Sequence, residues 1–177
     1  MQSVDISALP IRLKQLRLEL GWSLEDMASA IGAANRGVVS NWEASNERQR
    51  IPPLGTLVAL ARWFGVSLDY LVGIAGAERD NAWVNAGKSA LRERYPVEVR
   101  QLPVATPAAR MRLAIAILQD SAPDGFFLAR IAANLLHTEE SLGQLLDHGE
   151  VPGPVLDKFA RLADMPAAWF YLRPEDV

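Results

Sequence analysis

The sequence predicts an all-α protein made of two small helical bundles joined by a linker with one helix. Apolar residues recur at helical spacing along most of the 177 residues, and Gly or Pro separates the apolar segments. Half of the residues are hydrophobic, which is enough for a real core. The last third of the chain also echoes the pattern of the first. We therefore expect domains over residues 1–75 and 107–177 with the linker over residues 76–106.

The first bundle is expected to contain five short helices, and local sequence signals mark where they begin and end. Pro10 suits the first turn of an opening helix, and Gly21 ends that helix. Ser23 is the predicted N-cap of the second helix, with Asp26 completing a capping box three residues later. Gly32 then stops the second helix.

A corner of small residues separates the second helix from a third, which starts at about Asn35 or Arg36. Helical spacing gives this third helix an apolar side and a polar side. The apolar side consists of Val38, Val39 and Trp42, and the other face shows Arg36, Ser40 and Asn41. Small residues at such a junction let the second of two helices project outward. A projecting helix can enter the major groove of DNA and present polar side chains to base edges.

Two further helices complete the first bundle. A polar loop over residues 44–52 precedes a fourth helix over residues 54–64, which Gly65 ends. Ser67 is predicted to cap a short fifth helix over residues 68–72. These helices are expected to share one small core.

Together these features resemble the Cro/repressor type of helix-turn-helix, also called the XRE family, over about residues 9–73. The residues that carry the resemblance are Ser23, Met27, Ala28 and Gly32, followed by Val39, Ser40, Trp42 and Glu43. The resemblance implies a five-helix, lambda-repressor-like bundle that binds double-stranded DNA. It also implies a regulator of transcription, which we expect to be a homodimeric repressor that reads a two-fold operator. We expect a cytoplasmic location because the chain has no cysteine, no apolar run long enough for a membrane span and no signal pattern at its N-terminus.

The third helix supplies the residues that are expected to read bases. Arg36 can make a bidentate contact with guanine, Asn41 can pair with adenine, and Ser40 can contact a base or a phosphate. Asn35 has two candidate roles, as a base contact or as the N-cap of this helix. For the other three side chains, ordinary surface polarity is the alternative.

Four more residues are expected to contact phosphates. Arg48 and Arg50 follow the third helix, and the alternative is that they only keep a polar loop soluble. Ser23 and Thr56 lie near the amide ends of the second and fourth helices, whose free N–H groups can hold phosphates.

Two residues at the end of the third helix are expected to be structural. Trp42 is predicted to lie in the core. Glu43 is predicted to pair with an arginine of the opening helix, which is either Arg12 or Arg17.

The linker is predicted to contain a helix over residues 77–95, with Trp83 on its apolar side. Pro96 and Pro103 are then expected to break the chain into an extended connection. One short strand over residues 96–104 is the alternative.

The last third of the chain repeats the apolar spacing of the first bundle, which predicts a degenerate second copy of the same five-helix plan. In the first match, Leu128, Ile131, Ala132 and Leu135 align without a gap on Leu24, Met27, Ala28 and Ile31. In the second match, Leu156, Phe159, Ala160 and Arg161 align on Leu57, Leu60, Ala61 and Arg62, and Trp169–Phe170 fall on Tyr70–Leu71.

The second copy lacks chemistry suited to DNA. Its counterpart of the third helix carries Glu139, Glu140 and Asp147 but no Lys or Arg, and carboxylates repel phosphates. We therefore expect it to serve self-association or to bind a protein partner. Trp83, Trp169 and Phe170 are the expected dimerisation residues, although the last two are most simply core. The alternative function is a protein-binding module, such as an antitoxin-like or anti-repressor protein, that acts through this acidic domain.

The composition of the chain argues against several other classes of function. The net charge is −3, and the acid is concentrated in residues 106–177, which carry six Lys or Arg and ten Asp or Glu. The chain has no cysteine and no long apolar run, so we expect no thiolate metal site and no membrane span. His137 and His148 lack further ligands at metal-like spacing. We expect no catalytic residues and no cofactor, since no nucleophile or phosphate-loop motif occurs. A cavity lined by His137 and Trp169 would instead favour a ligand sensor or an enzyme.

Overall fold

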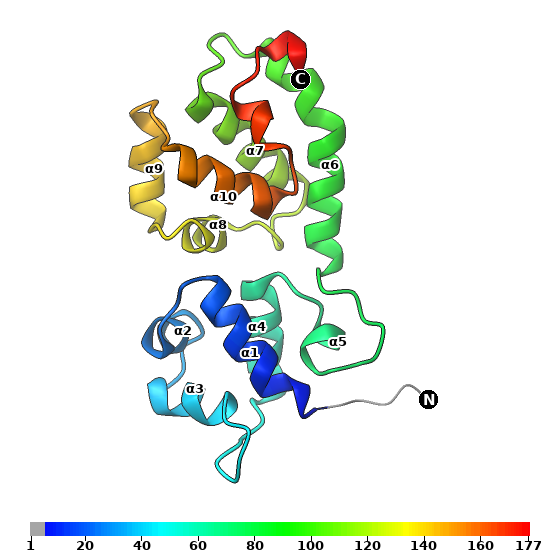
Figure 1. Cartoon of the computed structure of the whole chain (residues 1–177), viewed down its shortest axis with the longest axis vertical. Helices are drawn as coiled ribbons and strands as arrows, with labels where there is room; N and C mark the ends of the chain where they lie inside the picture. The colour runs from blue at the N-terminus through cyan, green and yellow to red at the C-terminus, as the bar shows by residue number, and fades with distance from the viewer. Residues whose placement is uncertain (1–5) are drawn as a thin grey trace. The chain divides into compact units, whose positions relative to one another are not determined.

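The computed structural model describes residues 6–177, and the chain divides into two compact units, Met1–Ala82 and Trp83–Val177 (Figure 1). The prediction of an all-α fold is confirmed. An isolated bridge between Val66 and Asp80 is the single β-pairing in the described part of the chain. Each unit encloses a hydrophobic core of its own.

The first unit contains the five predicted helices. They are α1 (Ala8–Glu19), α2 (Leu24–Ala30), α3 (Arg36–Trp42), α4 (Leu54–Phe64) and α5 (Leu68–Leu71). The predicted caps define these limits. Ser23 and Asp26 form a capping box at the start of α2, and Ser67 caps α5. Gly32 and Gly65 adopt the left-handed conformation, with φ of 66° and 68°, just after α2 and at the end of α4.

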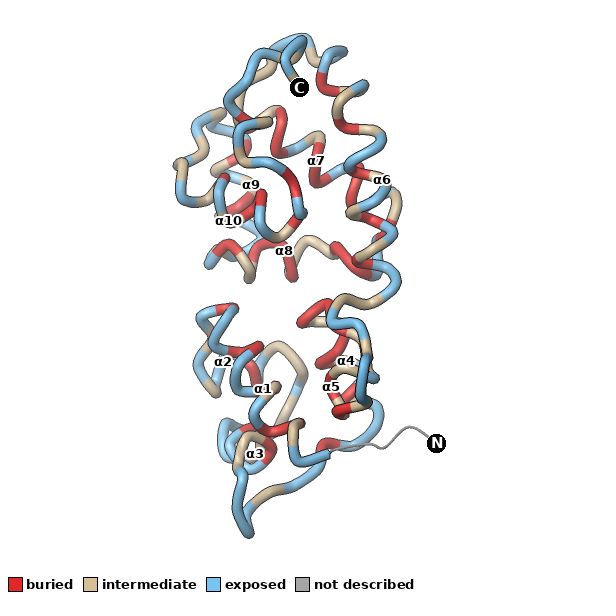
Figure 2. The backbone as a smooth tube through the Cα atoms, turned by 45° about the vertical axis from the view of Figure 1, so that its right-hand side comes forward, coloured by how far each residue is buried: buried red, intermediate tan, exposed pale blue. Residues whose placement is uncertain are grey.

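The core of the first unit joins one face of each helix. Met27, Ala28, Val39 and Trp42 contribute from α2 and α3, which pack closely against each other. The other buried apolar residues come mainly from α1 and α4, as the red segments of the tube show (Figure 2). The position of α3 is therefore set by packing on its buried side.

The second unit is also helical. Its elements are α6 (Ala82–Glu98), η1 (Val99–Gln101), α7 (Pro107–Ser121), α8 (Leu128–Asn134), α9 (Glu139–Asp147), α10 (Gly153–Ala163), η2 (Ala167–Phe170) and η3 (Pro174–Asp176). Among the described helices, none combines the length and apolarity that a membrane span requires.

The linker helix differs from the prediction. α6 runs through Pro96 to Glu98, so the expected break at this proline and the alternative short strand are both wrong. A proline in the last turn of a helix removes few backbone hydrogen bonds, and the buried Tyr95 and Val99 on either side hold the segment in the core. Because α6 also buries Leu91 in the second core, it is part of the second unit. The three-part division of the chain stays a prediction.

Two helices of the second unit repeat the length of a helix in the first unit, and each repeats the hydrogen bond that follows that helix at the equivalent residues. α8 has seven residues, as α2 has, and α10 has eleven, as α4 has. The corner bond from the Ala33 N–H to the Ala28 carbonyl (2.8 Å) has a counterpart from His137 to Ala132 (2.9 Å). The bond from Val66 to Ala61 that closes α4 likewise has a counterpart from Met165 to Ala160, and both are 3.0 Å.

Candidate nucleic-acid interface

Helix α3 has one buried and one exposed side, as its sequence period predicts. Val39 is fully buried and Trp42 is 6% exposed, so Trp42 lies in the core as expected. Arg36, Ser40 and Asn41 are all exposed on the other side. Arg36 has no side-chain partner among the described residues. The three predicted base-reading side chains therefore share one free surface.

A buried ion pair fixes the C-terminal end of α3. The Arg17 guanidinium donates to both carboxylate oxygens of Glu43, through Nε at 2.7 Å and Nη2 at 2.8 Å. Both side chains are less than a tenth exposed, and this carboxylate raises the pKa of Arg17. Nη1 of Arg17 also donates to the Trp22 carbonyl at 2.7 Å. Of the two predicted partners for Glu43, the structure selects Arg17.

Arg12, the other predicted partner, contacts a different element. Its guanidinium carbon lies 4.4 Å from the centre of the Tyr70 ring, and Nη1 donates to the Tyr70 carbonyl. Arg12 therefore ties α1 to α5. Among residues 6–177, the carboxylate at the end of α3 therefore pairs with Arg17 and not with Arg12.

The N-terminal end of α3 is held by Asn35. Its side-chain oxygen accepts hydrogen bonds from the N–H groups of Gly37 (2.8 Å) and Val38 (3.2 Å). Of its two predicted roles, the helix cap is the one present in the structure. The cap stabilises the first turn of α3 and the Arg17–Glu43 pair anchors its last residue, which together preorganise its exposed face.

The loop after α3 extends away from the helix and then turns back toward α4 (Figure 1). The Arg50 N–H donates to the Asn41 carbonyl at 3.0 Å, which joins the loop to the end of the exposed face. Arg48 and Arg50 are both exposed. Sequence reasoning missed Asn46, whose side-chain oxygen accepts from the Arg48 N–H at 3.0 Å and shapes the turn. An asparagine within a polar loop is the signal that predicts such a turn.

The two predicted phosphate sites at helix ends differ in charge. Ser23 Oγ accepts from the Asp26 N–H at 3.1 Å, and the Asp26 carboxylate accepts from the Ser23 N–H at 2.7 Å. Hydrogen bonding to the carboxylate by the Ser23 side chain and by the Ser23 N–H lowers the pKa of Asp26. The first turn of α2 also carries Glu25, whereas the first turn of α4, with Thr56, has no acidic residue. A phosphate is therefore better accommodated near Thr56 than near Ser23.

We expect Ser23→Ala to lower the free energy of unfolding by about 0.5–2 kcal/mol, because the cap of α2 is lost. The effect should depend on pH. The pKa of Asp26 is lower in the folded state than its ordinary value near 3.9, so its contribution is present well above that value and is lost as the pH falls through the folded-state pKa. Urea unfolding of both proteins at pH 7 and pH 3 measures this. A difference in stability that grows on acidification would contradict it.

The predicted dimerisation residues lie in the second unit in three different environments. Trp83, at the start of α6, is 53% exposed. Trp169 is half-buried and stacks on Tyr95 with ring centres 5.5 Å apart. Phe170 is 1% exposed and belongs to the core, so it is not available to a dimer surface in this structure. A dimer role for Trp83 and Trp169 stays a prediction.

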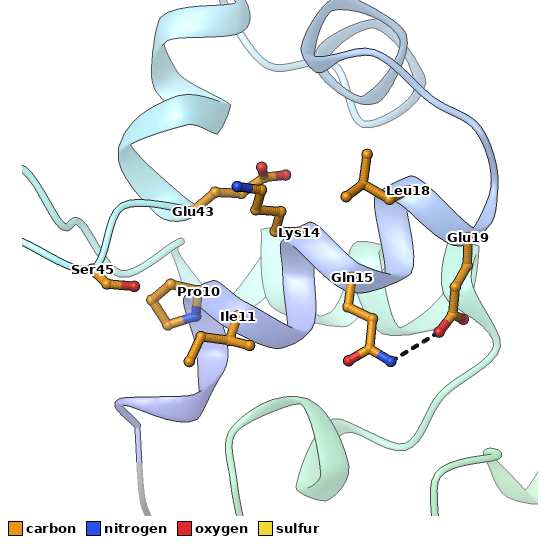
Figure 3. Close-up of a pocket in the computed structure, with 8 residues that line it drawn as sticks. All are labelled: Pro10, Ile11, Lys14, Gln15, Leu18, Glu19, Glu43 and Ser45. Atoms are coloured by element: carbon orange, nitrogen blue, oxygen red, sulfur yellow. Dashed lines mark hydrogen bonds between the residues drawn. The ribbon is translucent and has the colours of Figure 1, made fainter.

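An open groove of about 710 Å³ runs along the exposed side of α1 (Figure 3). Its lining residues are Pro10, Ile11, Lys14, Gln15, Leu18, Glu19, Glu43 and Ser45. Two of its charged groups already have protein partners, because Glu43 binds Arg17 and Glu19 binds Arg79 and Gln15. None of these eight lining residues is a histidine. Within residues 6–177, no cluster of His, Asp and Glu is placed to hold a metal.

Comparison with known proteins identifies the segment that contains α2 and α3. A family model described as helix-turn-helix matches residues 13–71. An uncharacterized HTH-type transcriptional regulator, YobD, of Bacillus subtilis (strain 168) is 40% identical over 63 residues. That match covers 36% of this chain and 53% of the relative, so the aligned region spans about half the length of that protein. No solved structure matches the chain. The predicted resemblance is confirmed for this segment, and residues 13–71 form a helix-turn-helix domain.

Proposed function

We propose that this protein is a sequence-specific DNA-binding regulator of transcription and that α3 is its reading helix. The observation that carries the proposal is the geometry of α3. Arg36, Ser40 and Asn41 share one exposed face, while Asn35 caps the first turn of the helix and Glu43 ties its other end to Arg17 of α1. A helix held in this way can enter the major groove without reorganising. The name of the similar regulator from Bacillus subtilis is consistent with this role.

Each side chain of the surface has a role in the proposed complex. Arg36 donates to the acceptor edge of a guanine, and Asn41 pairs with an adenine. Ser40 contacts a base or a phosphate beside them. Arg48 and Arg50 contact phosphates from the loop, and the N–H groups near Thr56 hold another phosphate. Such a regulator would act in the cytoplasm.

A homodimeric repressor on a two-fold operator is the form of regulator that we propose. One small helical domain makes few base contacts, and two copies double them on half-sites about 34–36 Å apart. The second unit is a suitable dimerisation module. Its repeated corner and closing hydrogen bonds favour a degenerate second copy of the first fold, although the Glu139–Asp147 helix carries no Lys or Arg. The exposed Trp83 is available for self-association.

Arg36→Ala should lower the affinity for the selected operator by about 1–3 kcal/mol and relax the preference at one base pair. In-vitro selection with the full-length protein, followed by titration of the best sequence, measures both effects. Arg161→Ala is the matched control, since this exposed arginine lies on α10 in the second unit. Specific binding that survives the combined replacement of Arg36, Ser40 and Asn41 by alanine would overturn the proposal.

A protein-binding module is the second candidate function. The exposed carboxylates of Glu139 and Glu140 favour it, because they give the start of α9 an anionic surface, whereas Asp147 at its end pairs with Arg112 at 2.6 Å. Selection with the wild-type protein separates the two functions. A failure to enrich any DNA sequence, together with a stoichiometric protein complex that charge reversal at these residues abolishes, would favour the second candidate.

A further inference from the structure

Gly37 lies in the middle of the exposed face of α3 and has no side chain there. It follows Arg36 directly and lies three and four residues before Ser40 and Asn41, so the four residues form one patch of the helix surface. Gly37 itself is exposed. The predicted reading surface therefore has polar side chains around a bare stretch of backbone.

The backbone does not require glycine at this position. Gly37 lies inside a regular helix, and its φ is not positive, unlike that of Gly32 at the corner. Glycine is a weaker helix former than alanine, so its presence lowers the helical stability of α3. The backbone conformation at residue 37 therefore does not explain why glycine occurs there.

Core packing does not require glycine there either. A Cβ at residue 37 would have one neighbour within 4 Å, the side-chain oxygen of Asn35 at 3.0 Å. Gly87 on α6 is different, because a Cβ there would lie 2.7 Å from the ring of the buried Phe126. Inside the fold, the absence of a Cβ at residue 37 therefore affects only the capping side chain of Asn35.

We infer that Gly37 is a specificity-determining position of the DNA site. The inference rests on the proposed function. Near the start of a reading helix, residues lie closest to the base edges. Without a Cβ, the backbone of α3 can approach one base pair between Arg36 and Asn41, and the base edge occupies the space left by the missing side chain. The thymine methyl group is the part of a base that projects into the major groove as an apolar group, and it fits such a space.

The test compares full-length wild-type protein with Gly37→Ala by in-vitro selection, operator titration and thermal unfolding. The matched control is Gly143→Ala on α9, because a Cβ at residue 143 would meet nothing within 4 Å. We expect Gly37→Ala to bind the wild-type operator about tenfold more weakly, or to change the preferred base at one position. Its unfolding temperature is the separate readout of the Asn35 cap, because the new Cβ lies 3.0 Å from the Asn35 side-chain oxygen. Gly143→Ala should keep the wild-type affinity and preference.

A second pair of proteins separates the base contact from the contact with Asn35. Serine is an N-cap as good as asparagine but has a shorter side chain, so Asn35→Ser relieves the contact at 3.0 Å. The double variant Asn35→Ser/Gly37→Ala should still lose about tenfold in affinity relative to Asn35→Ser alone.

Two results would overturn the inference in different ways. Equal affinity and equal base preference in each pair would show that Gly37 serves only the cap, with the proposed function intact. A wild-type protein that selects no DNA sequence would overturn the proposed function and, with it, the role of Gly37.

Discussion

Glu43→Ala is expected to lower the free energy of unfolding of the first unit by about 3–5 kcal/mol. The substitution leaves the Arg17 guanidinium buried, with the Trp22 carbonyl as its remaining hydrogen-bond acceptor. A buried cation without its carboxylate costs far more than an exposed one. The end of α3 also loses its anchor, so DNA affinity should fall as well. Urea unfolding and operator titration of the same protein measure the two effects.

Two control proteins make this result specific. Glu19 pairs with Arg79 at the surface, where the two side chains are 40% and 50% exposed, so Glu19→Ala should cost at most about 1 kcal/mol. The double variant Arg17→Met/Glu43→Leu removes both buried charges and should recover most of the stability lost in Glu43→Ala. A loss in Glu43→Ala no larger than that in Glu19→Ala would show that the buried pair does not hold α3.

Phe159→Ala is expected to lower the free energy of unfolding of the second unit by about 3–5 kcal/mol. The ring is fully buried on α10, and its centre lies 5.8 Å from that of Phe170 at an interplanar angle of 63°. The substitution creates a cavity at the centre of this core and removes an edge-to-face contact. Hydrogen exchange followed by mass spectrometry can assign the loss of protection to one unit or the other.

Val97→Ala is the matched control for Phe159→Ala. Val97 is 60% exposed on α6, so its truncation should change stability by no more than about 0.5 kcal/mol. Because the two units have separate cores, Phe159→Ala should leave the protection of α2–α4 unchanged. An equal loss of protection in both units would mean that the chain unfolds as one cooperative body.

Much of the fold follows from local sequence signals. Helix α4 begins at Leu54 and ends at Phe64, as predicted from its apolar spacing and from Gly65 after it. The capping box of Ser23 and Asp26 is likewise present as predicted. These features depend on residues at most four apart, whose geometry is set within one turn of helix.

The candidate site was predictable in part. The 3.6-residue period places Arg36, Ser40 and Asn41 on one face of α3 without knowledge of the rest of the fold. The cap role of Asn35 and the link from Arg50 to Asn41 depend on hydrogen-bond geometry, which composition and spacing do not define. The sequence does not show whether Gly37 is required by the fold, because that depends on which atoms surround it in the structure.

The sequence by itself determined the limits of α2 and α4 and the buried and exposed sides of α3, because these depend on period and on near neighbours. The tertiary structure decided which distant groups meet. It assigned Arg17 rather than Arg12 to Glu43, because packing directs those two side chains of α1 to different elements. In the tertiary structure α6 also continues past Pro96, because the burial of Tyr95 and Val99 outweighs the backbone hydrogen bond that the proline cannot make. Such choices depend on contacts between residues far apart in the chain, which only the packed core defines.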